Sequence, residues 1–198
     1  MSRLLVATTN RGKQREFRRL LADLPAELVT PDAIGFDLEV DEPYDTYAEN
    51  AAAKAAAYAA ASGLVSLADD SGIEVAALDW GPGVRSARWA GDRGREADSL
   101  LAALSGVTDR RARMVCALAV AMARPDDEPA VELFTGIMEG SIATERRGAG
   151  GFGYDPVFLV DGRATTAELP EAEKDRVSHR GRAVAAAIPR LREVLRDH

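Results

Sequence analysis

The spacing of apolar and polar residues predicts a strand, a polar turn and a helix at the start of the chain. Residues 4–7 form a compact apolar run, and Phe17, Leu20, Leu21 and Leu24 then recur at helical spacing. The polar residues between the two segments mark the turn. Such an arrangement aims the first amides of the helix back toward the end of the strand.

The next part of the chain predicts a second short strand at residues 27–30 and a long helix at residues 47–62. Thr46 and Glu49 form a capping-box pattern at the start of this helix. Gly63 follows its last turn, where glycine commonly ends a helix.

The second half of the chain alternates short predicted elements with glycine and proline breaks. Trp89 lies in a basic and aromatic segment at 84–91; it could stack on a base, but a buried structural tryptophan is the usual outcome. The predicted elements are a strand at 73–78, a helix at 96–104, strands at 113–123 and 130–143 joined by a hairpin turn at 125–129, a strand at 157–160, and a last helix capped by Ser178 that runs to about Arg196.

The stretch from Leu64 to Gly72 carries the most suggestive chemistry. A short apolar run ends there in Asp69, Asp70 and Ser71, which predicts a buried strand that delivers acidic groups to a turn. Carboxylates held at the end of a rigid strand can bind a hard divalent cation or take a proton from water. The alternative is an ordinary polar turn, because Asp, Ser and Gly are common turn residues.

Composition places the chain among globular proteins. Of its 198 residues, 46% are hydrophobic and 29% are charged, which suits one domain over residues 1–198. No apolar stretch approaches the about 20 residues of a membrane span, and no signal-peptide pattern opens the chain, so we expect a cytoplasmic protein. The single cysteine, Cys116, lies in an apolar run, and we expect it to pack in the core.

The net charge of −7 argues against a broad basic face for nucleic-acid polymers, but it allows a small anion in a local basic pocket. The first predicted helix offers one candidate. Thr9 or Asn10 can cap it, Gly12 can relax the turn, and Lys13 adds a positive charge at the end that favours phosphate. The alternative is a capped helix with a solvated surface lysine.

Two further charged residues are candidates for the same pocket. Lys54 shares a helix face with Asn50, four residues earlier, although most helix lysines are simply solvated. Glu42, just ahead of that helix, can supply an oxygen to a metal ion, although most loop glutamates supply none.

A glycine-rich segment at residues 148–153 matches the spelling of a dinucleotide-binding motif, but it precedes a strand instead of opening a helix, which excludes that function. Its glycines permit close backbone approach, Phe152 offers a stacking surface, and Asp155 offers an acceptor for base-edge donors. The alternative is a flexible loop. His179 and Arg180, in the first turn of the last helix, present converging donors, although a lone histidine is more often structural.

Five motifs occur in one order along almost the whole chain. They are residues 8–13 (TTNRGK), Glu49 and Asn50 with Lys54, residues 68–72 (ADDSG), residues 151–156 (GFGYDP), and residues 178–180 (SHR). This series resembles the inosine triphosphatase family, also called Ham1-like or RdgB-like proteins. The resemblance implies a homodimeric α/β protein with a long, bent mixed β-sheet flanked by helices, in which two lobes enclose a central nucleotide cleft.

The resemblance also implies an activity, which is the Mg²⁺-dependent hydrolysis of dITP, ITP and XTP to the monophosphate and pyrophosphate. By position, Asp70 resembles the proton acceptor and a magnesium ligand, and Glu42 a second metal-associated carboxylate. The groups around the triphosphate would be Thr8, Thr9, Asn10, Arg11, Gly12, Lys13, Lys54, Ser71 and Lys174, and the base would face Phe152, Gly153, Tyr154, Asp155, His179 and Arg180. Thr9 departs from the family pattern, in which many relatives have glycine.

Two other functions remain open at this point. A pyrophosphatase of the related Maf type would prefer pyrimidine or modified nucleotides, which a substrate panel with dTTP and UTP separates. A non-catalytic nucleotide-binding module would bind ITP without releasing pyrophosphate, although the intact Asp69, Asp70, Lys13 and Lys54 argue against it. Neither alternative needs a nucleic-acid polymer or a membrane as partner.

Overall fold

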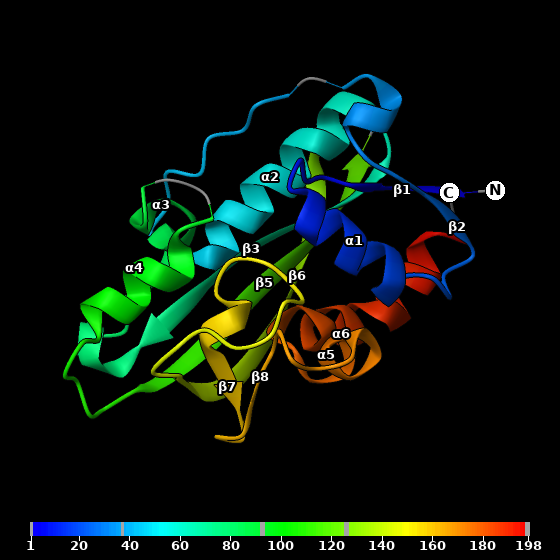
Figure 1. Ribbon diagram of the computed structural model, residues 1–198. Coiled ribbons are helices and arrows are strands. Elements are labelled where there is room, and N and C mark those ends of the chain that lie inside the picture. The colour runs from blue at the N-terminus through cyan, green and yellow to red at the C-terminus, as the bar shows by residue number, and fades with distance from the viewer. Residues whose placement is uncertain (1, 37, 92–93, 125–126, 197–198) are drawn as a thin grey trace. The chain divides into compact units, whose positions relative to one another are not determined.

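The computed structural model describes residues 2–36, 38–91, 94–124 and 127–196 (Figure 1). Within them the chain forms a mixed α/β fold, as expected: strand β1 pairs in parallel with β2 and β3, whereas β4 pairs antiparallel with β3, and β7 pairs antiparallel with both β6 and β8. The strand order is β2 (Ala26–Val29), β1 (Ser2–Val6), β3 (Val65–Val75), β5 (Arg111–Arg124), β6 (Asp127–Ile142), β7 (Phe158–Val160) and β8 (Ala164–Thr165), with β4 (Gly81–Pro82) beside β3.

The chain divides into two compact units. The first comprises residues up to Asp70 together with 116–136 and 180–198, and the second comprises residues 71–115 and 137–179. Strands β3, β5 and β6 contribute residues to both units. A single domain over residues 1–198 stays a prediction.

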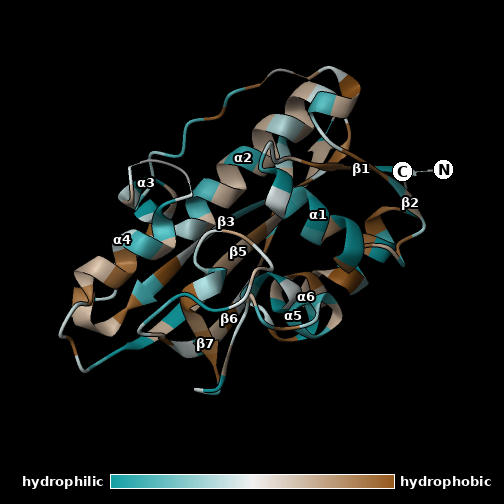
Figure 2. Cartoon of the chain, viewed as in Figure 1, coloured by the Kyte–Doolittle hydropathy of each residue, from teal (hydrophilic) through white to brown (hydrophobic). Residues whose placement is uncertain are grey.

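The first unit buries apolar side chains on two faces of its strands. On one face, Phe17 of α1 (Arg11–Leu20), Leu21 at the end of that helix and Leu191 of α6 (His179–Val194) join Leu118 of β5 in a core of large side chains. On the other face, alanines of α2 (Tyr47–Ser62) meet Ala68 of β3 and alanines of β5, so that this core is richer in small side chains, although it also contains Leu5 and Tyr58. Figure 2 shows the corresponding hydrophobic colouring along β1 and β5.

Both predicted helix starts of the first unit are confirmed. Of the two candidate caps for α1, Asn10 is the one used: its Oδ1 accepts from the amides of Gly12 at 2.8 Å and Lys13 at 3.2 Å. Thr46 caps α2 by accepting from the amide of Glu49 at 3.2 Å. Gly63 ends that helix with φ of +69°, a conformation that favours glycine.

The second unit has a core of its own, in which Ile73 of β3 and Met138 of β6 pack with Leu100 and Phe158. Its helices are α3 (Ser86–Trp89), α4 (Glu96–Ala103) and α5 (Glu171–Val177). It also has single helical turns at η2 (Ala76–Leu78), η3 (Gly83–Arg85) and η4 (Asp155–Val157). The first unit has a turn of this kind at η1 (Asp32–Ile34). Across the described residues of both units, no helix is long and apolar enough to span a membrane.

The structure corrects the turn predicted at residues 69–72. Strand β3 continues without a break from Val65 to Val75, so Asp69 and Asp70 lie inside a strand. Of the separate strand expected at 73–78, residues 73–75 are the end of β3, and residues 76–78 form the helical turn η2 instead. Gly72 has no positive φ. The acidic pair remains in the strand because each carboxylate finds a partner from another element, as described below.

One smaller expectation also changes, and one helix was not predicted. Trp89 is 38% exposed and therefore not buried, because it ends the short helix α3 at the surface. Helix α5 was not predicted, since its seven residues are mostly charged. Residues 125 and 126 of the predicted hairpin turn lie outside the described residues, while β5 ends at Arg124 and β6 begins at Asp127.

Candidate active site

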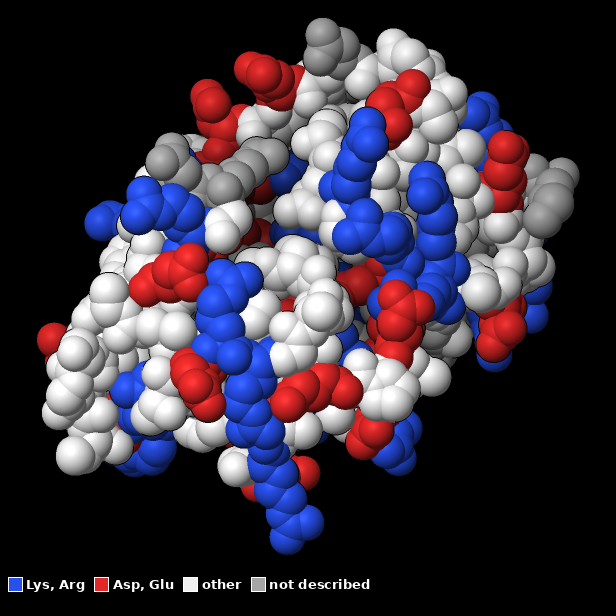
Figure 3. Space-filling model, viewed as in Figure 1, with Lys and Arg blue, Asp and Glu red and all other residues white. Residues whose placement is uncertain are grey.

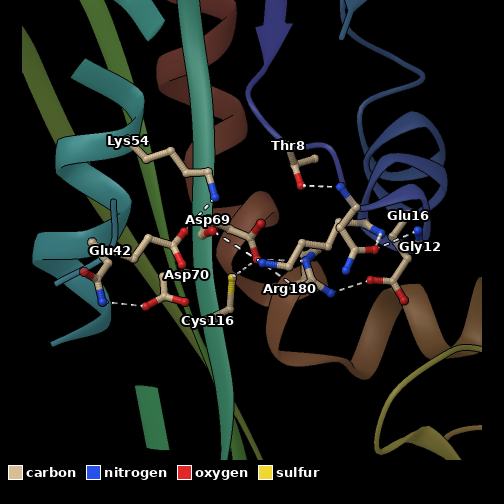
Figure 4. Close-up of polar contacts among 12 residues, drawn as sticks. Thr8, Gly12, Glu16, Glu42, Lys54, Asp69, Asp70, Cys116 and Arg180 are labelled. Carbon is tan, nitrogen blue, oxygen red and sulfur yellow. Dashed lines mark hydrogen bonds and ion pairs between the residues drawn. The ribbon is translucent and has the colours of Figure 1, made fainter. Parts of the chain in front are cut away.

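Successive side chains of a strand point to opposite faces, and this separates the two aspartates of β3. Asp69 faces the side of α1 and α6, where it contacts Lys13 and Arg180 (Figure 4). Asp70 faces the side of α2, where it contacts Asn50. Two adjacent carboxylates therefore have different surroundings.

Asp69 is fully enclosed and paired with two cations. Its Oδ2 accepts from Arg180 Nη2 at 2.9 Å and Nε at 3.2 Å, and it lies 3.1 Å from Lys13 Nζ. Burial by itself raises the pKa of this carboxyl, but the charges and hydrogen bonds of Lys13 and Arg180 outweigh burial and hold the pKa well below its usual value. Asp69 is therefore ionised throughout the physiological range.

Arg180 connects helix α1 to strand β3 through its guanidinium group. While two of its nitrogens bind Asp69, Nη1 donates to Oε2 of Glu16 at 2.5 Å. All three side chains are buried, so the cation is balanced by two carboxylates in the interior. Burial lowers the pKa of Arg180, but the two carboxylates outweigh it and raise the pKa above its usual value.

Cys116 lies beside this group, with its Sγ 3.9 Å from Oδ2 of Asp69. Burial is the largest cause that raises the pKa of the thiol, and the charge of Asp69 raises it further. A protonated, fully buried thiol is a poor nucleophile, so the expectation that Cys116 packs in the core is confirmed.

Asp70 has the opposite electrostatic character. It is 7% exposed, and its Oδ2 accepts from Nδ2 of Asn50 at 3.0 Å. Burial raises its pKa; the hydrogen bond from Asn50 and the charge of Lys13 oppose this, while the charges of Glu42 and Asp69 add to it, and the net pKa lies above the usual value. A carboxylate with a raised pKa is better suited to accept a proton than one held ionised by cations.

Glu42 and Lys54 form a pair near the two aspartates, with 2.6 Å between Oε1 and Nζ. Burial lowers the pKa of Lys54, but the hydrogen bond and charge of Glu42, together with the charges of Asp69 and Asp70, raise it above its usual value. The charges of three carboxylates therefore favour the protonated form of Lys54, and Glu42 is the one in contact with it. The neighbouring acids Asp41 and Asp45 are exposed, whereas Glu42 is partly buried.

The segment from Thr8 to Lys13 joins β1 to α1 in the same unit. Thr8 is buried, and its Oγ1 accepts from the amide of Asn10 at 3.2 Å, while Thr9 and Arg11 are exposed. Lys13 extends from the first turn of α1 to Asp69. A helix N-terminus with a lysine beside it is a suitable anion site.

The second unit brings together another set of predicted residues around Asp155. Its Oδ2 accepts from the amide of Phe152 at 2.7 Å and from Nζ of Lys174 at 2.6 Å. Lys174 is 6% exposed, and its Nζ lies 5.4 Å from the centroid of the Phe152 ring. Lysine, aromatic ring and carboxylate therefore form one cluster in this unit.

The other predicted residues of the second unit occupy separate positions. The hydroxyl of Tyr154 donates to the backbone oxygen of Ser86 at 2.8 Å, and burial raises the pKa of the phenol. Gly153, which precedes Tyr154, has a positive φ of +61°. His179 is buried at the first position of α6, and Ser71 follows Asp70 in β3.

Among the buried polar residues of the first unit that sequence reasoning left without a role, Asn50 and Glu16 bind side chains of the candidate site. Asn50 holds both Asp70 and the backbone of Tyr44, and Glu16 holds Arg180. The four-residue spacing of Asn50 and Lys54 is a usable signal, because it aims both side chains from one helix face. Glu16 gave a weaker signal, since it is the single acid in the basic sequence of α1.

The residues that could hold a divalent cation are Asp70 and Glu42, which carry hard oxygen atoms. Among the residues that the structure describes, no three His, Cys, Asp or Glu side chains form a group suited to a metal ion. Mg²⁺ does not need such a group, because it is commonly held by one or two carboxylates, water and the phosphates of a substrate. A buried carboxylate whose pKa is raised fits this use, since a cation relieves the cost of its charge.

Comparison with known proteins identifies the family of this chain. The model of the Ham1 family matches residues 4–190. A dITP/XTP pyrophosphatase of Symbiobacterium thermophilum is 46% identical, with 98% of each chain covered, and one of Streptomyces coelicolor is 45% identical, with 98% of this chain and 100% of that protein covered.

Solved structures show the same fold. A HAM1 protein from Coxiella burnetii superimposes with a TM-score of 0.81 at 37% identity over 100% of both chains. The Ham1 protein of Staphylococcus aureus gives a TM-score of 0.78 at 36% identity over 99% of both. With a family match over nearly its whole length and relatives above 40% identity, this chain belongs to the Ham1 family.

Proposed function

We propose that this protein hydrolyses the deaminated purine nucleotides dITP, ITP and XTP to the monophosphate and pyrophosphate. The observation that carries the proposal is that the two adjacent aspartates have opposite pKa shifts and different contacts. Asp69 is held ionised by Lys13 and Arg180, while Asp70 keeps a raised pKa and a fixed orientation through Asn50. The names of the relatives, which are dITP/XTP pyrophosphatases, support the same substrate class.

Asp70 orients the attacking water and accepts its proton. Its burial and its hydrogen bond from Asn50 hold one oxygen in place, and its raised pKa brings its proton affinity closer to that needed of a general base. Ser71, the next residue in the strand, contacts phosphate and is not a nucleophile. No covalent intermediate with the protein is required.

The triphosphate binds at the cationic groups of the first unit. Lys13, Lys54 and the first amides of α1, from the segment Thr8, Thr9, Asn10, Arg11 and Gly12, neutralise charge on the departing pyrophosphate. Lys174 of the second unit is the further cation that the family pattern assigns to this end of the nucleotide. Each cation is already oriented by a carboxylate, so little reorganisation is needed.

Magnesium dependence is part of the proposal, with Asp70 and Glu42 as the protein ligands. When bound together with the triphosphate, Mg²⁺ neutralises phosphate charge and makes a coordinated water more acidic. Lys54 limits the charge that accumulates between Glu42 and Asp70, because it is paired with Glu42 at 2.6 Å.

The base is recognised by residues around the glycine-rich loop. Phe152, flanked by Gly153 and Tyr154, supplies the stacking surface, and Asp155 and His179 supply polar groups. Hypoxanthine and xanthine carry a carbonyl at the six position, which the donors of His179 and Arg180 satisfy, whereas the amino group of adenine would leave those donors unpaired. The guanidinium of Arg180 is bound by Glu16 and Asp69, so His179 is the donor of this pair that is not already held by two carboxylates.

A small anionic substrate suits the surface better than a nucleic-acid polymer does. On the face drawn in Figure 3, basic side chains are interspersed with acidic ones and form no continuous basic surface. The resemblance to the inosine triphosphatase family further supports a homodimer that acts in the cytoplasm. Light scattering after size-exclusion chromatography tests the dimer, which would have twice the 21.1 kDa mass of one chain.

The test of this function is a substrate panel with separate detection of pyrophosphate and orthophosphate. We expect pyrophosphate from ITP, dITP and XTP in the presence of Mg²⁺, with far less from ATP and GTP. A protein that is inert on all three, or that prefers dTTP and UTP, contradicts the proposal. Binding of ITP without pyrophosphate release would identify a non-catalytic module.

A further inference from the structure

The glycine-rich loop, residues 148–154, rests on a short segment that sequence reasoning did not single out. This segment, Thr165–Glu168, is called here the threonine segment. The amide of Gly150 donates to the backbone oxygen of Ala167 at 3.0 Å. A Cβ built at Gly148 would lie 2.6 Å from the carbonyl carbon of Ala167, so the loop backbone packs directly against the segment.

Asp155 joins the loop to this segment. One oxygen, Oδ2, accepts from the amide of Phe152 at 2.7 Å and from Lys174 at 2.6 Å. The carboxylate also lies against Gly151, where a Cβ would come 2.0 Å from Oδ2. Its position therefore determines the conformation of the loop at Gly151 and Phe152.

Thr166 holds the other oxygen of this carboxylate. Its hydroxyl donates to Oδ1 of Asp155 at 2.7 Å, and the residue is 1% exposed. The amide of Thr166 donates to the backbone oxygen of Phe158 at 2.9 Å. This hydrogen bond fixes the backbone that carries the hydroxyl. A carboxylate with both oxygens bound cannot rotate without losing a buried hydrogen bond.

The threonine segment fixes the beginning of the loop as well. Oε2 of Glu168 accepts from the amide of Thr165 at 2.8 Å and lies 3.1 Å from Nη2 of Arg147. The hydroxyl of Thr165 donates to the backbone oxygen of Arg147 at 2.8 Å. Arg147 immediately precedes the loop, so the loop is held at its start by Thr165 and Glu168 and near its end by Thr166.

We propose that Thr166 is a positioning residue for base recognition, which acts through Asp155. It locks the carboxylate that orders the Phe152 amide and Lys174, and so it presents the Phe152 ring in one conformation for the purine. Thr166 itself does not touch the substrate. This inference rests on the proposed function for the identity of the ligand, whereas the locking of the loop is a property of the protein alone.

Hydrogen exchange tests the locking without any substrate. In Thr166→Val the hydroxyl is replaced by a methyl group of similar size, which leaves Oδ1 of Asp155 buried without its donor, and we expect amide exchange in residues 148–154 to become about tenfold faster. Thr166→Ser restores the hydroxyl and should restore the protection. Thr30→Val replaces the hydroxyl of another buried threonine, in the first unit, and should leave exchange in the loop unaltered.

Kinetics separate positioning from general destabilisation. With ITP we expect Thr166→Val to raise KM about tenfold with little change in kcat, because the loop contributes to binding and not to the proton transfer. Thr166→Ser should behave like the unaltered protein. Should the valine variant not fold, Thr166→Ala removes the hydroxyl without added bulk and serves the same comparison.

Protection of the loop that is unchanged in Thr166→Val or Thr166→Ala would overturn the inference. Faster exchange throughout the molecule that serine does not reverse would also overturn it, since it would show a general packing role. Failure of the unaltered protein to hydrolyse ITP would instead contradict the proposed function. In that case the exchange experiment still decides whether Thr166 locks the loop.

Discussion

Asp69 and Asp70 are neighbours in strand β3, yet one carboxylate contacts Lys13 and Arg180 and the other contacts Asn50. Strand alternation causes this separation. Its consequence is that the pKa of Asp69 is lowered while the pKa of Asp70 is raised. The two residues should therefore respond to the same substitution in opposite ways.

For Asp69→Asn we expect a large loss of stability at neutral pH. The substitution leaves the buried Arg180 with Glu16 alone and weakens the hold on Lys13, and breaking a buried ion pair in this way costs about 3–5 kcal/mol. Urea unfolding at pH 7 measures the effect. Asp109→Asn, which breaks an exposed pair with Arg111, is the matched control and should change the midpoint little.

The stability lost in Asp69→Asn should depend on pH, and it should be smaller at low pH than at neutral pH. Because the pKa of Asp69 is lower in the folded than in the unfolded state, its stabilisation is fully present above the unfolded value of about 3.9 and is lost as pH falls toward the folded value. The difference in the free energy of unfolding between the unaltered protein and Asp69→Asn should become smaller below about pH 4. A difference in the free energy of unfolding that stays constant from pH 7 to pH 3 would contradict a lowered pKa of Asp69 in the folded protein.

For Asp70→Asn we expect no loss of stability. The folded state raises the pKa of Asp70, which means that it disfavours the ionised form, and a neutral amide removes this cost while still accepting from Asn50. Thermal unfolding at pH 7 should give a midpoint equal to or above that of the unaltered protein. A clearly lower midpoint would show that the carboxylate is needed for folding.

Replacing Lys54 tests the binding of the triphosphate. Lys54→Met removes a cation that lies 2.6 Å from Glu42, and the loss of one charge-assisted contact should raise KM for ITP about tenfold or more. Lys54→Arg keeps the charge and should recover part of the affinity. Equal KM values for the methionine variant and the unaltered protein would exclude a contact between Lys54 and the substrate.

Removal of divalent cations tests the proposed magnesium site. Dialysis against a chelator should abolish pyrophosphate release, and added Mg²⁺ should restore it. The predicted ligands are only two carboxylates, so tight binding should require the nucleotide as well as the protein. Calorimetric titration with Mg²⁺ alone should show weak binding, and full activity in a chelator would contradict the proposal.

The sequence predicted those elements whose cause is local. Thr46 and Gly63 bound helix α2 as their chemistry indicates, and Asn10 caps α1. The turn at Asp69 and Asp70 was wrong because Asp-Asp-Ser-Gly is ordinary turn composition. What keeps these residues in a strand is distant in sequence: Lys13 lies 56 positions from Asp69, and Arg180 lies 111 positions away.

In the candidate site, too, the sequence indicated individual residues but not the contacts between residues that are distant in sequence. The family pattern singled out Lys54, Asp155 and Lys174, but it contained no sign that Lys174 binds Asp155. Glu16 and Thr166 are ordinary helix and loop residues in the sequence, and their burial appears only when the chain is folded. Buried polar residues that hold other polar residues are hard to predict, because their partners come from elements that only the tertiary fold brings together.

The most direct test of the central claim compares the unaltered protein with Asp70→Asn in a single-turnover assay of pyrophosphate release from ITP with Mg²⁺. We expect the unaltered protein to release pyrophosphate in a single exponential phase and the variant to do so at a rate at least about a thousandfold lower, since the group that accepts the proton from water is lost. Circular dichroism and thermal unfolding would show the variant folded. A folded Asp70→Asn protein that releases pyrophosphate at a near-normal rate would contradict the account.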